Sequence, residues 1–300
     1  MSTYNGEKYI REQIDSVLAQ ERVHIELFIR DDGSSDGTRD IISEYAGRFG
    51  NIHADFGINL GYIRSFFTEL TVAKGFSYYA LCDQDDVWKP EKLITAVNAI
   101  KHEEELNGKD FPVVWHSSLA LTDSNLNVLS IRQMDKRIAS LESFMVWLHG
   151  RGCAMVFNES VYKLTLRVNS LGLVHASHDL ITVAVTYAFG GTVIFSPYAY
   201  VLYRQHSNNT SHAPATLFQS AKNVVASVYG LNCRNTRFAA ELLRAVGNEV
   251  SSSIRKTLNT VSRHKHNLMY RLKIVLSPKF RTGDFRLTLA GKIKALLGGL

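Results

Sequence analysis

The sequence predicts an α/β protein with a mostly parallel sheet, helices on both faces of the sheet, and a basic helical extension at its C-terminal end. Three observations predict this class. Short apolar runs alternate with amphipathic helical patterns up to about residue 118. Polar clusters close several of the apolar runs, and Lys and Arg accumulate near the C-terminus. Such alternation is typical of βαβ units covered by helices.

The first part of the chain shows the alternation most clearly. Ile10, Ile14 and Val17 fall on one face of the first predicted helix. Pro90 opens a later helix at the first-turn position that proline tolerates. The predicted elements are helix 7–20, strand 24–30, a helix from about 38, strand 51–56, helix 62–74, strand 77–82, a helix from 90, and strand 112–118.

The pattern becomes mixed after Asn125 and is helical and basic beyond residue 214. The predicted elements between these points are helix 140–148, strand 152–157, helices 160–168 and 179–189, and strands 192–196 and 199–203. We therefore expect a domain over residues 1–213 that is made of two parts, residues 1–118 and residues 119–213. A helical tail, residues 214–300, follows it.

The net charge of +6 is unevenly distributed. From Lys222 onward, 15 Lys and Arg against 3 Asp and Glu give +12, so the rest of the chain carries +6 − 12 = −6. The basic stretch lacks interleaved stacking aromatics, which argues against nucleic acid as a partner. It suits either a peripheral contact with a membrane or a solvated helical cap.

Composition also sets expectations about location. Polar residues follow Met1 directly, and no apolar run of about 18 residues occurs, so we expect neither a signal peptide nor a membrane span. Three Cys without metal-binding spacing indicate reduced thiols in the cytoplasm. An α/β domain of this kind should also open with a buried strand before Thr3. We expect that strand to be missing from the sequence. We favour a start site upstream of Met1, because loss of the strand would leave an unfilled groove with unpaired backbone groups in the sheet.

Three polar clusters follow predicted strands: Thr3-Tyr4-Asn5, Asp31-Asp32-Gly33-Ser34 and Asp83-Gln84-Asp85-Asp86. Each alone has a structural interpretation, as a loop, as a turn with a helix cap, or as a solvated group of charges. Ligands of open α/β sheets bind beyond the carboxyl ends of the strands. Neighbouring carboxylates repel one another unless a cation or water separates them. Together the clusters indicate a site for a nucleotide and a metal ion.

The stretches STYNGEKYIREQIDSVLAQ, IRDDGSSDGT, Asn59-Leu60-Gly61 and ALCDQDDVWKPEKL resemble, in this order, the nucleotide-binding half of glycosyltransferase family 2, which has the Rossmann-like GT-A fold. The resemblance covers residues 2–100. It implies that residues 1–118 form a nucleotide-sugar-binding half and residues 119–213 an acceptor half, and it implies a role for each cluster. Thr3 and Tyr4 would line the base pocket, and Asn5 would also bind the donor nucleotide. Asp32 or Asp31 would bind the pyrimidine edge, and Asp83 would approach the ribose. Asp85, in the DxD motif, would ligate Mg²⁺ or Mn²⁺ on the diphosphate, and Asp86 is a weaker candidate ligand.

The second half contains the candidate acceptor side. Asp179 stands at the start of an apolar helix, where an acid also complements the helix dipole. The resemblance implies that Asp179 is the general base. The string from Tyr203 to Asn209 resembles a segment of bacterial rhamnosyltransferases. It implies that His206 lies near the metal or diphosphate and that Arg204 meets phosphate charge.

We therefore expect an inverting, metal-dependent glycosyltransferase. It would move a sugar from a nucleoside-diphosphate sugar, dTDP-rhamnose first and a UDP-sugar second, to a glycan or lipid-linked saccharide in cell-surface polysaccharide synthesis. Its location would be the cytoplasm, peripherally at the inner face of the plasma membrane. Two alternatives stay open. A nucleotidyltransferase should show a Gly-rich phosphate loop, which is not visible. A non-catalytic or truncated nucleotide-sugar-binding homologue would keep the fold without the reaction.

Overall fold

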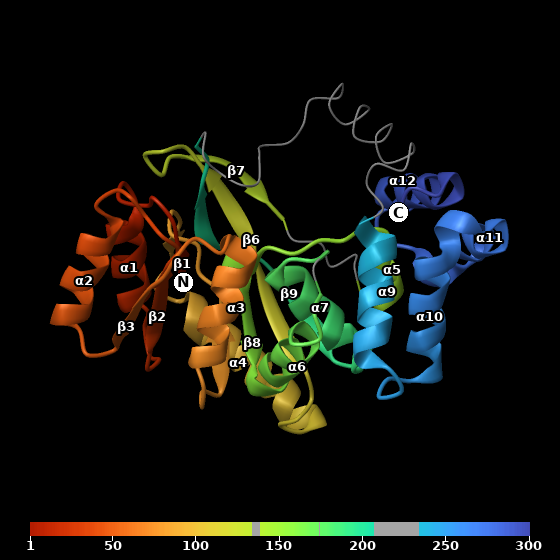
Figure 1. The fold of residues 1–300 in the computed structure, drawn as a ribbon, viewed down its shortest axis with the longest axis horizontal. Helices are drawn as coiled ribbons and strands as arrows, with labels where there is room; N and C mark the ends of the chain where they lie inside the picture. The colour runs from red at the N-terminus through yellow and green to blue at the C-terminus, as the bar shows by residue number, and fades with distance from the viewer. Residues whose placement is uncertain (134–138, 174, 207–233) are drawn as a thin grey trace. The chain divides into compact units, whose positions relative to one another are not determined.

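The computed structural model describes residues 1–133, 139–173, 175–206 and 234–300 (Figure 1). The chain divides into two compact units built from interleaved segments. Unit 1 comprises Met1–Met134, Arg151–Leu166 and Ile194–Asn209, and unit 2 comprises Asp135–Gly150, Arg167–Val193 and Thr210–Leu300. The predicted boundary at residues 213 and 214 lies outside the described residues.

Unit 1 begins with a small parallel sheet in the order β1-β2-β3. Its strands are β1 (Ser2–Thr3), β2 (Leu27–Asp31) and β3 (Ile52–Phe56). Thr3 pairs with Asp31, and Asp31 pairs with Phe56, so the carboxyl ends of all three strands are level. Apolar side chains from α1 (Ile10–Leu18) and α2 (Thr38–Arg48) join β2 in one core.

The second sheet has the order β4-β8-β6-β9-β5, with β7 paired to β6. Its strands are β4 (Tyr78–Ala80), β8 (Met155–Asn158), β6 (Val113–Thr122), β9 (Thr192–Arg204), β5 (Val87–Trp88) and β7 (Val128–Arg132). The pairs β4–β8, β6–β8, β6–β7 and β5–β9 are antiparallel. The α/β class is confirmed, but the strand pairing is mixed rather than mostly parallel.

Three further helices support these strands: α3 (Tyr62–Val72), α4 (Lys92–Asn107) and α6 (Glu159–Asn169). Helix α4 begins two residues after Pro90 and ends at Asn107, and the next residue, Gly108, has a φ of +94° that favours glycine. Its buried Ala96 and Ile100 pack against Val113 and Trp115 of β6. This packing anchors the start of α4, just after the Asp83–Asp86 loop.

An apolar cavity of about 420 Å³ opens beside β2 and β4. Residues 22–28 line it on one side and residues 76–82 on another, with Met1 also in its wall. The first strand has only two residues, so β2 pairs with β1 at Arg30 and Asp31 alone. The buried Met1 ammonium donates to the Phe28 carbonyl at 2.6 Å, and burial lowers the pKa of that ammonium. Where the sequence predicted a missing strand, the structure has a β1 of two residues that pairs with β2.

The described part of unit 2 is mainly helical. Its helices are α5 (Leu141–Val146), α7 (His178–Ala188), α9 (Arg234–Val246), α10 (Ser252–Arg263), α11 (Leu268–Leu276) and α12 (Phe285–Leu297). The side chains of Ser251, Asn267 and Asp284 accept hydrogen bonds from backbone N–H groups at the starts of α10, α11 and α12. Within the described ranges, no helix has the length and apolar character needed to cross a bilayer.

Candidate active site

The three strand-end loops of unit 1 are hydrogen-bonded to one another. The Tyr4 N–H donates to Oε1 of Gln84 at 2.7 Å, and Nε2 of Gln84 returns a bond to the Tyr4 carbonyl at 3.1 Å. The Asn5 N–H donates to Oγ of Ser34 at 2.8 Å, and Oδ1 of Asn5 accepts from the Ser35 N–H at 2.9 Å. The sequence places these loops up to 80 residues apart. The structure therefore brings the three clusters together, although β1 and β2 belong to one sheet and β4 to the other.

The first loop presents one side chain to solvent and hides another. Thr3 is buried, and its hydroxyl donates to the Arg30 carbonyl at 3.3 Å. The Tyr4 ring is 49% exposed, so it is available to stack on a planar ligand. Gly6 lets the Gln84 amide approach, because a Cβ there would lie 2.5 Å from Oε1. Of the two candidate base-pocket residues, only Tyr4 has an accessible side chain.

Asp31 and Asp32 are both buried, and both carboxylates are bonded within the protein. Oδ2 of Asp31 accepts from the Ser34 N–H at 3.0 Å and from Nε of Arg39 at 2.7 Å. Burial alone would raise the pKa of Asp31, but the bonds from Ser34 and Arg39 outweigh it and hold this pKa below its ordinary value. Asp32 accepts from the Leu60 and Gly61 N–H groups, both at 2.8 Å. These bonds fix the loop, and recognition of a pyrimidine by either residue stays a prediction.

Asp85 and His206 are in direct contact. Nε2 of His206 lies 2.8 Å from Oδ2 of Asp85, and both side chains are partly exposed. The imidazole also stacks on the Tyr9 ring, with centroids 5.1 Å apart. A carboxylate oxygen and an imidazole nitrogen form a donor pair that suits Mn²⁺, and the carboxylate also suits Mg²⁺. The residues present therefore fit a divalent cation.

Arg204 supports this pair from inside the protein. Its guanidinium donates to the Asp85 carbonyl at 2.9 Å, to Glu12 at 2.6 Å and to the Ser124 carbonyl. It also lies over the Tyr9 ring at 4.4 Å. Arg204 is 1% exposed, so its guanidinium is bonded to the protein rather than to water. The bond to the Asp85 carbonyl holds the Asp85 loop in this arrangement. A contact between Arg204 and phosphate stays a prediction.

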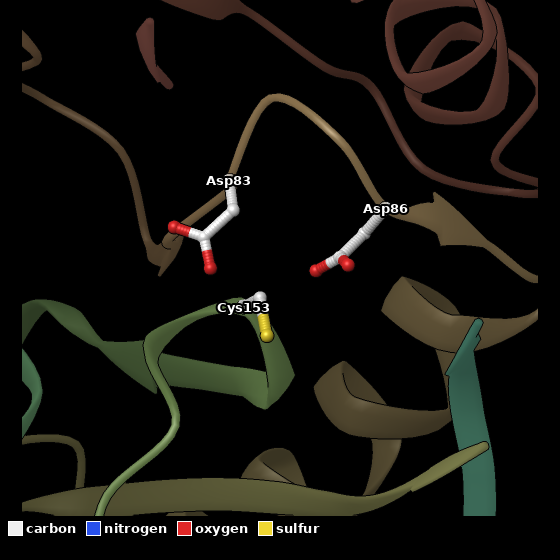
Figure 2. Close-up of side chains that lie close together, drawn as sticks. All are labelled: Asp83, Asp86 and Cys153. Carbon is white, nitrogen blue, oxygen red and sulfur yellow. The ribbon is translucent and has the colours of Figure 1, made fainter. Parts of the chain in front are cut away.

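Asp83, Asp86 and Cys153 form a second cluster, with donor atoms within 4.8 Å of one another (Figure 2). Asp86 is fully buried, and Oδ1 accepts from the Arg204 N–H at 3.2 Å. Burial, with the charges of Asp85 and Asp83, raises the pKa of Asp86 well above its ordinary value. A thiol is a soft ligand that Mg²⁺ and Mn²⁺ do not favour. Asp86 thus suits a structural role in this loop better than a metal ligand.

Lys92 lies close behind the cluster, at the start of α4. Its ammonium donates to the Cys153 carbonyl at 2.7 Å and lies 3.1 Å from the centroid of the Trp88 ring. Burial lowers the pKa of Lys92 to about 7. Two buried titratable groups, Asp86 and Lys92, therefore lie beside the loop that carries Asp83 and Asp85. Burial disfavours the charged form of each group.

Asp179 belongs to unit 2 and lies in the first turn of α7. Its Oδ1 accepts from the Ser177 hydroxyl and from the Leu180 N–H, the latter at 2.9 Å. Gly150 packs closely against it, since a Cβ there would lie 3.0 Å from Oδ2. A negative charge in the first turn of α7 interacts favourably with the helix dipole, so Asp179 also has a structural role. Its role as a base stays a prediction.

Sequence reasoning missed three supporting residues: Tyr9, Glu12 and Gln84. Gln84 had a signal, because it lies between two candidate carboxylates. Tyr9 and Glu12 had none beyond their place in an amphipathic helix. Within the Tyr203–Asn209 string, residues 207–209 lie outside the described residues.

The fold and the strand-end loops define an α/β protein of the GT-A type, and comparison with known proteins agrees. Residues 1–111 match the family model described as glycosyl transferase family 2. A crystal structure of S. aureus TarS in complex with UDP-GlcNAc shares the fold, with a TM-score of 0.56, 16% identity, and coverage of 99% of this chain and 88% of that one. The structure of the mannosyltransferase PcManGT from Pyrobaculum calidifontis, in complex with GDP-Man and Mn²⁺, also shares the fold. Its TM-score is 0.50 and its sequence identity is 15%, with coverage of 97% of this chain and 72% of that one.

Curated relatives are similar over shorter stretches. An uncharacterized protein of Mycobacterium tuberculosis is 29% identical over 218 residues, 71% of this chain and 60% of the relative. The chain thus spans about 60% of the length of that relative. The dTDP-rhamnosyl transferase RfbG of Shigella flexneri is 32% identical over 110 residues, 33% of this chain and 36% of RfbG. The comparisons thus support glycosyltransferase family 2 over residues 1–111 and a GT-A-like fold for the chain.

Proposed function

We propose that this protein is an inverting, metal-dependent glycosyltransferase that moves a sugar from a nucleoside-diphosphate sugar to a hydroxyl group of a glycan. One observation carries the proposal. The three hydrogen-bonded loops and the contact between Asp85 and His206 lie in one unit, at the carboxyl ends of β1, β2, β4 and β9. This is where α/β sheets bind their ligands.

On the donor side, the exposed Tyr4 ring would stack on the base, and Asn5 with Asp31 or Asp32 would border its polar edge. Asp83 would accept hydrogen bonds from the ribose. Asp85 and His206 would hold Mg²⁺ or Mn²⁺. When bound, the ion supplies Lewis-acid stabilisation of the charge on the leaving diphosphate. The Mn²⁺ and GDP-Man in the PcManGT structure support a metal-dependent nucleotide-sugar site.

On the acceptor side, Asp179 would act as general base. The acceptor oxygen forms a bond to the anomeric carbon while the bond from that carbon to the diphosphate oxygen breaks. The acceptor proton passes to a carboxylate oxygen of Asp179, and the electron pair leaves with the nucleoside diphosphate. A carboxylate that is ionised at neutral pH is suited to this step. Because attack occurs opposite the leaving group, the anomeric centre inverts.

The preferred donor is dTDP-rhamnose, followed by a UDP-hexose. Similarity to a dTDP-rhamnosyl transferase supports rhamnose, as does the Tyr203–His206 string. TarS in complex with UDP-GlcNAc supports the second choice. The acceptor would be a lipid-linked saccharide used in cell-surface polysaccharide synthesis. The protein would work at the cytoplasmic face of the membrane, with its basic helical tail as a peripheral contact.

A screen of nucleotide sugars by product release tests the function. Purified protein is incubated with each donor, a lipid-linked saccharide mixture and Mn²⁺, and the nucleotide products are separated by chromatography. The proposal expects nucleoside diphosphate from one donor, at least tenfold above the others. Release of pyrophosphate would indicate a nucleotidyltransferase. Donor binding without any nucleotide product would indicate a non-catalytic binder.

A further inference from the structure

The last two helices of unit 2 expose an unusual amount of apolar surface. Leu268, Leu272 and Leu276 of α11 are 62%, 41% and 74% exposed. Phe285, Leu289 and Ile293 of α12 are 80%, 48% and 44% exposed. Each set has a spacing of four residues, which places its members along one face of a helix. Each helix therefore carries an apolar stripe that faces solvent.

The two helices are tied together as a hairpin. Nη1 of Arg271 donates to the Leu296 carbonyl at 3.2 Å, and Nζ of Lys292 donates to the Val275 carbonyl at 2.5 Å. These bonds join the middle of α11 to the end of α12, and the end of α11 to the middle of α12, so the helices run antiparallel. The opposite side of α12 is packed, because a Cβ at Gly291 would lie 2.1 Å from Val146. The exposed stripes are therefore held on a supported scaffold.

The charge around the stripes is strongly positive. Residues 268–300 contain seven Lys and Arg and a single acid, Asp284. The Asp284 carboxylate accepts from the Leu287 N–H at 2.8 Å and caps α12. Arg271 and Lys292 are used inside the hairpin. Lys294 is half-buried, and its ammonium lies over the Trp147 ring at 5.3 Å. The other four basic side chains around the turn and along the helices are exposed: Lys273, Lys279, Arg281 and Arg286.

From this surface we propose that the α11–α12 hairpin docks on the surface of an anionic lipid bilayer. Leucine and phenylalanine side chains enter the boundary between head groups and acyl chains, and exposed basic side chains pair with anionic head groups. Helix α12 has 13 residues, so it is too short to span the hydrocarbon core and would lie in the interface. This inference deepens the peripheral contact proposed above and names the segment that makes it. It does not require that the reaction proposed for the other residues occurs.

Vesicle sedimentation of the full chain tests the inference. The probes are vesicles of equal parts phosphatidylglycerol and phosphatidylcholine, and vesicles of phosphatidylcholine alone. We expect binding to the first at least roughly tenfold tighter than to the second, since each basic residue near the surface contributes roughly fivefold. We also expect binding to weaken as salt is added. Equal binding to both vesicles, or to neither, would overturn the proposal.

Two variants locate the contact. Leu289→Ser with Phe285→Ser should weaken binding at least roughly tenfold, because each removes a large apolar side chain from the interface. The matched control, Leu106→Ser with Leu129→Ser, removes two side chains that are 67% and 63% exposed in unit 1, and should bind like the parent. Equal losses in both double variants would overturn the assignment to the hairpin.

The charges are tested in the same way. Replacing Lys279, Arg281 and Arg286 by Gln should reduce binding to the anionic vesicles, while replacing Lys74, Lys101 and Lys109 by Gln should not. Circular dichroism checks that each variant keeps its helices.

Sedimentation velocity tests whether a second copy of the chain, rather than a lipid surface, covers the apolar stripes. A dimer that dissociates in the Phe285 and Leu289 variant, without vesicle binding by the parent, would contradict the proposal. Loss of nucleotide release with vesicle binding intact would instead count against the proposed function alone.

Discussion

Nε2 of His206 lies 2.8 Å from Oδ2 of Asp85, although 121 residues separate them in the sequence. The contact depends on a buried frame, because Arg204 donates to the Asp85 carbonyl and to the Glu12 carboxylate. The two strand-end segments are thus held together before any ligand binds. Such preorganisation is what a metal site needs from its surroundings.

The first prediction concerns the metal. Asp85→Asn should remove measurable Mn²⁺ binding in isothermal titration calorimetry, because the amide lacks the charge of the carboxylate. His206→Ala should weaken binding by about 10- to 100-fold, since it removes one donor and a partner of Asp85. Asp110→Asn, an exposed acid away from the site, is the control and should bind Mn²⁺ like the parent. Unchanged affinity in Asp85→Asn would rule out Asp85 as a ligand.

The second prediction separates the base from the donor site. Asp179→Asn should retain donor affinity within about twofold while transfer falls by about 100-fold or more, because general-base catalysis of this kind is worth 10²–10⁴-fold. The control is Asp40→Asn, which removes an exposed first-turn acid from α2. It should cost about 0.3–1 kcal/mol in stability and leave transfer intact. Full transfer by Asp179→Asn would mean that another group accepts the proton.

The third prediction concerns pH. Burial lowers the pKa of Lys92 from 10.5 to about 7, so between these values the unfolded chain binds a proton that the folded protein does not. The free energy of unfolding should therefore rise with pH across this window, by up to about 1.4 kcal/mol per pH unit from this residue. Chemical denaturation at about pH 7 and about pH 8.5 measures the slope. Lys92→Met should lose this rise, whereas exposed Lys109→Met should keep it. Identical slopes in Lys92→Met and the parent would refute a neutral Lys92.

The fourth prediction concerns the cavity beside β2. An added segment of about five apolar, β-forming residues before Met1 should raise the free energy of unfolding by at least about 2 kcal/mol. It would fill part of the 420 Å³ cavity and replace the buried Met1 ammonium by an amide. A Gly/Ser extension of equal length is the control, because it lengthens the chain without apolar side chains. Equal stability of the two extended proteins would show that the cavity does not accept a strand.

The sequence predicted much of the donor side because strand ends obey a simple rule. A polar cluster that follows a buried strand lies at the carboxyl end of that strand. The clusters that contain Tyr4, Asp31 and Gln84 come together at such ends, although β1 and β2 belong to one sheet and β4 to the other. The apolar spacing of Ile10 and Ile14 likewise predicted α1 to within three residues at each end.

Other features depend on contacts that local patterns do not encode. The expected strands 192–196 and 199–203 form one continuous β9, although Pro197 lies between them. Strand β5 has two residues and exists because Val87 and Trp88 pair with Leu202 and Val201. The burial of Arg204 depends on Glu12, 192 residues away. Contacts between distant residues decide whether strands pair parallel or antiparallel and which side chains are exposed. The local spacing of apolar residues does not predict either property.

The most direct test of the central claim is release of nucleoside diphosphate from the preferred sugar nucleotide, measured with and without Mn²⁺. The parent protein should release nucleoside diphosphate with acceptor and Mn²⁺ present, and lose this activity when the ion is chelated. Asp85→Ala should be inactive under both conditions, while Asp110→Asn should behave like the parent. Equal release by the parent and by Asp85→Ala, whatever the metal content, would contradict a metal-dependent donor site built on Asp85.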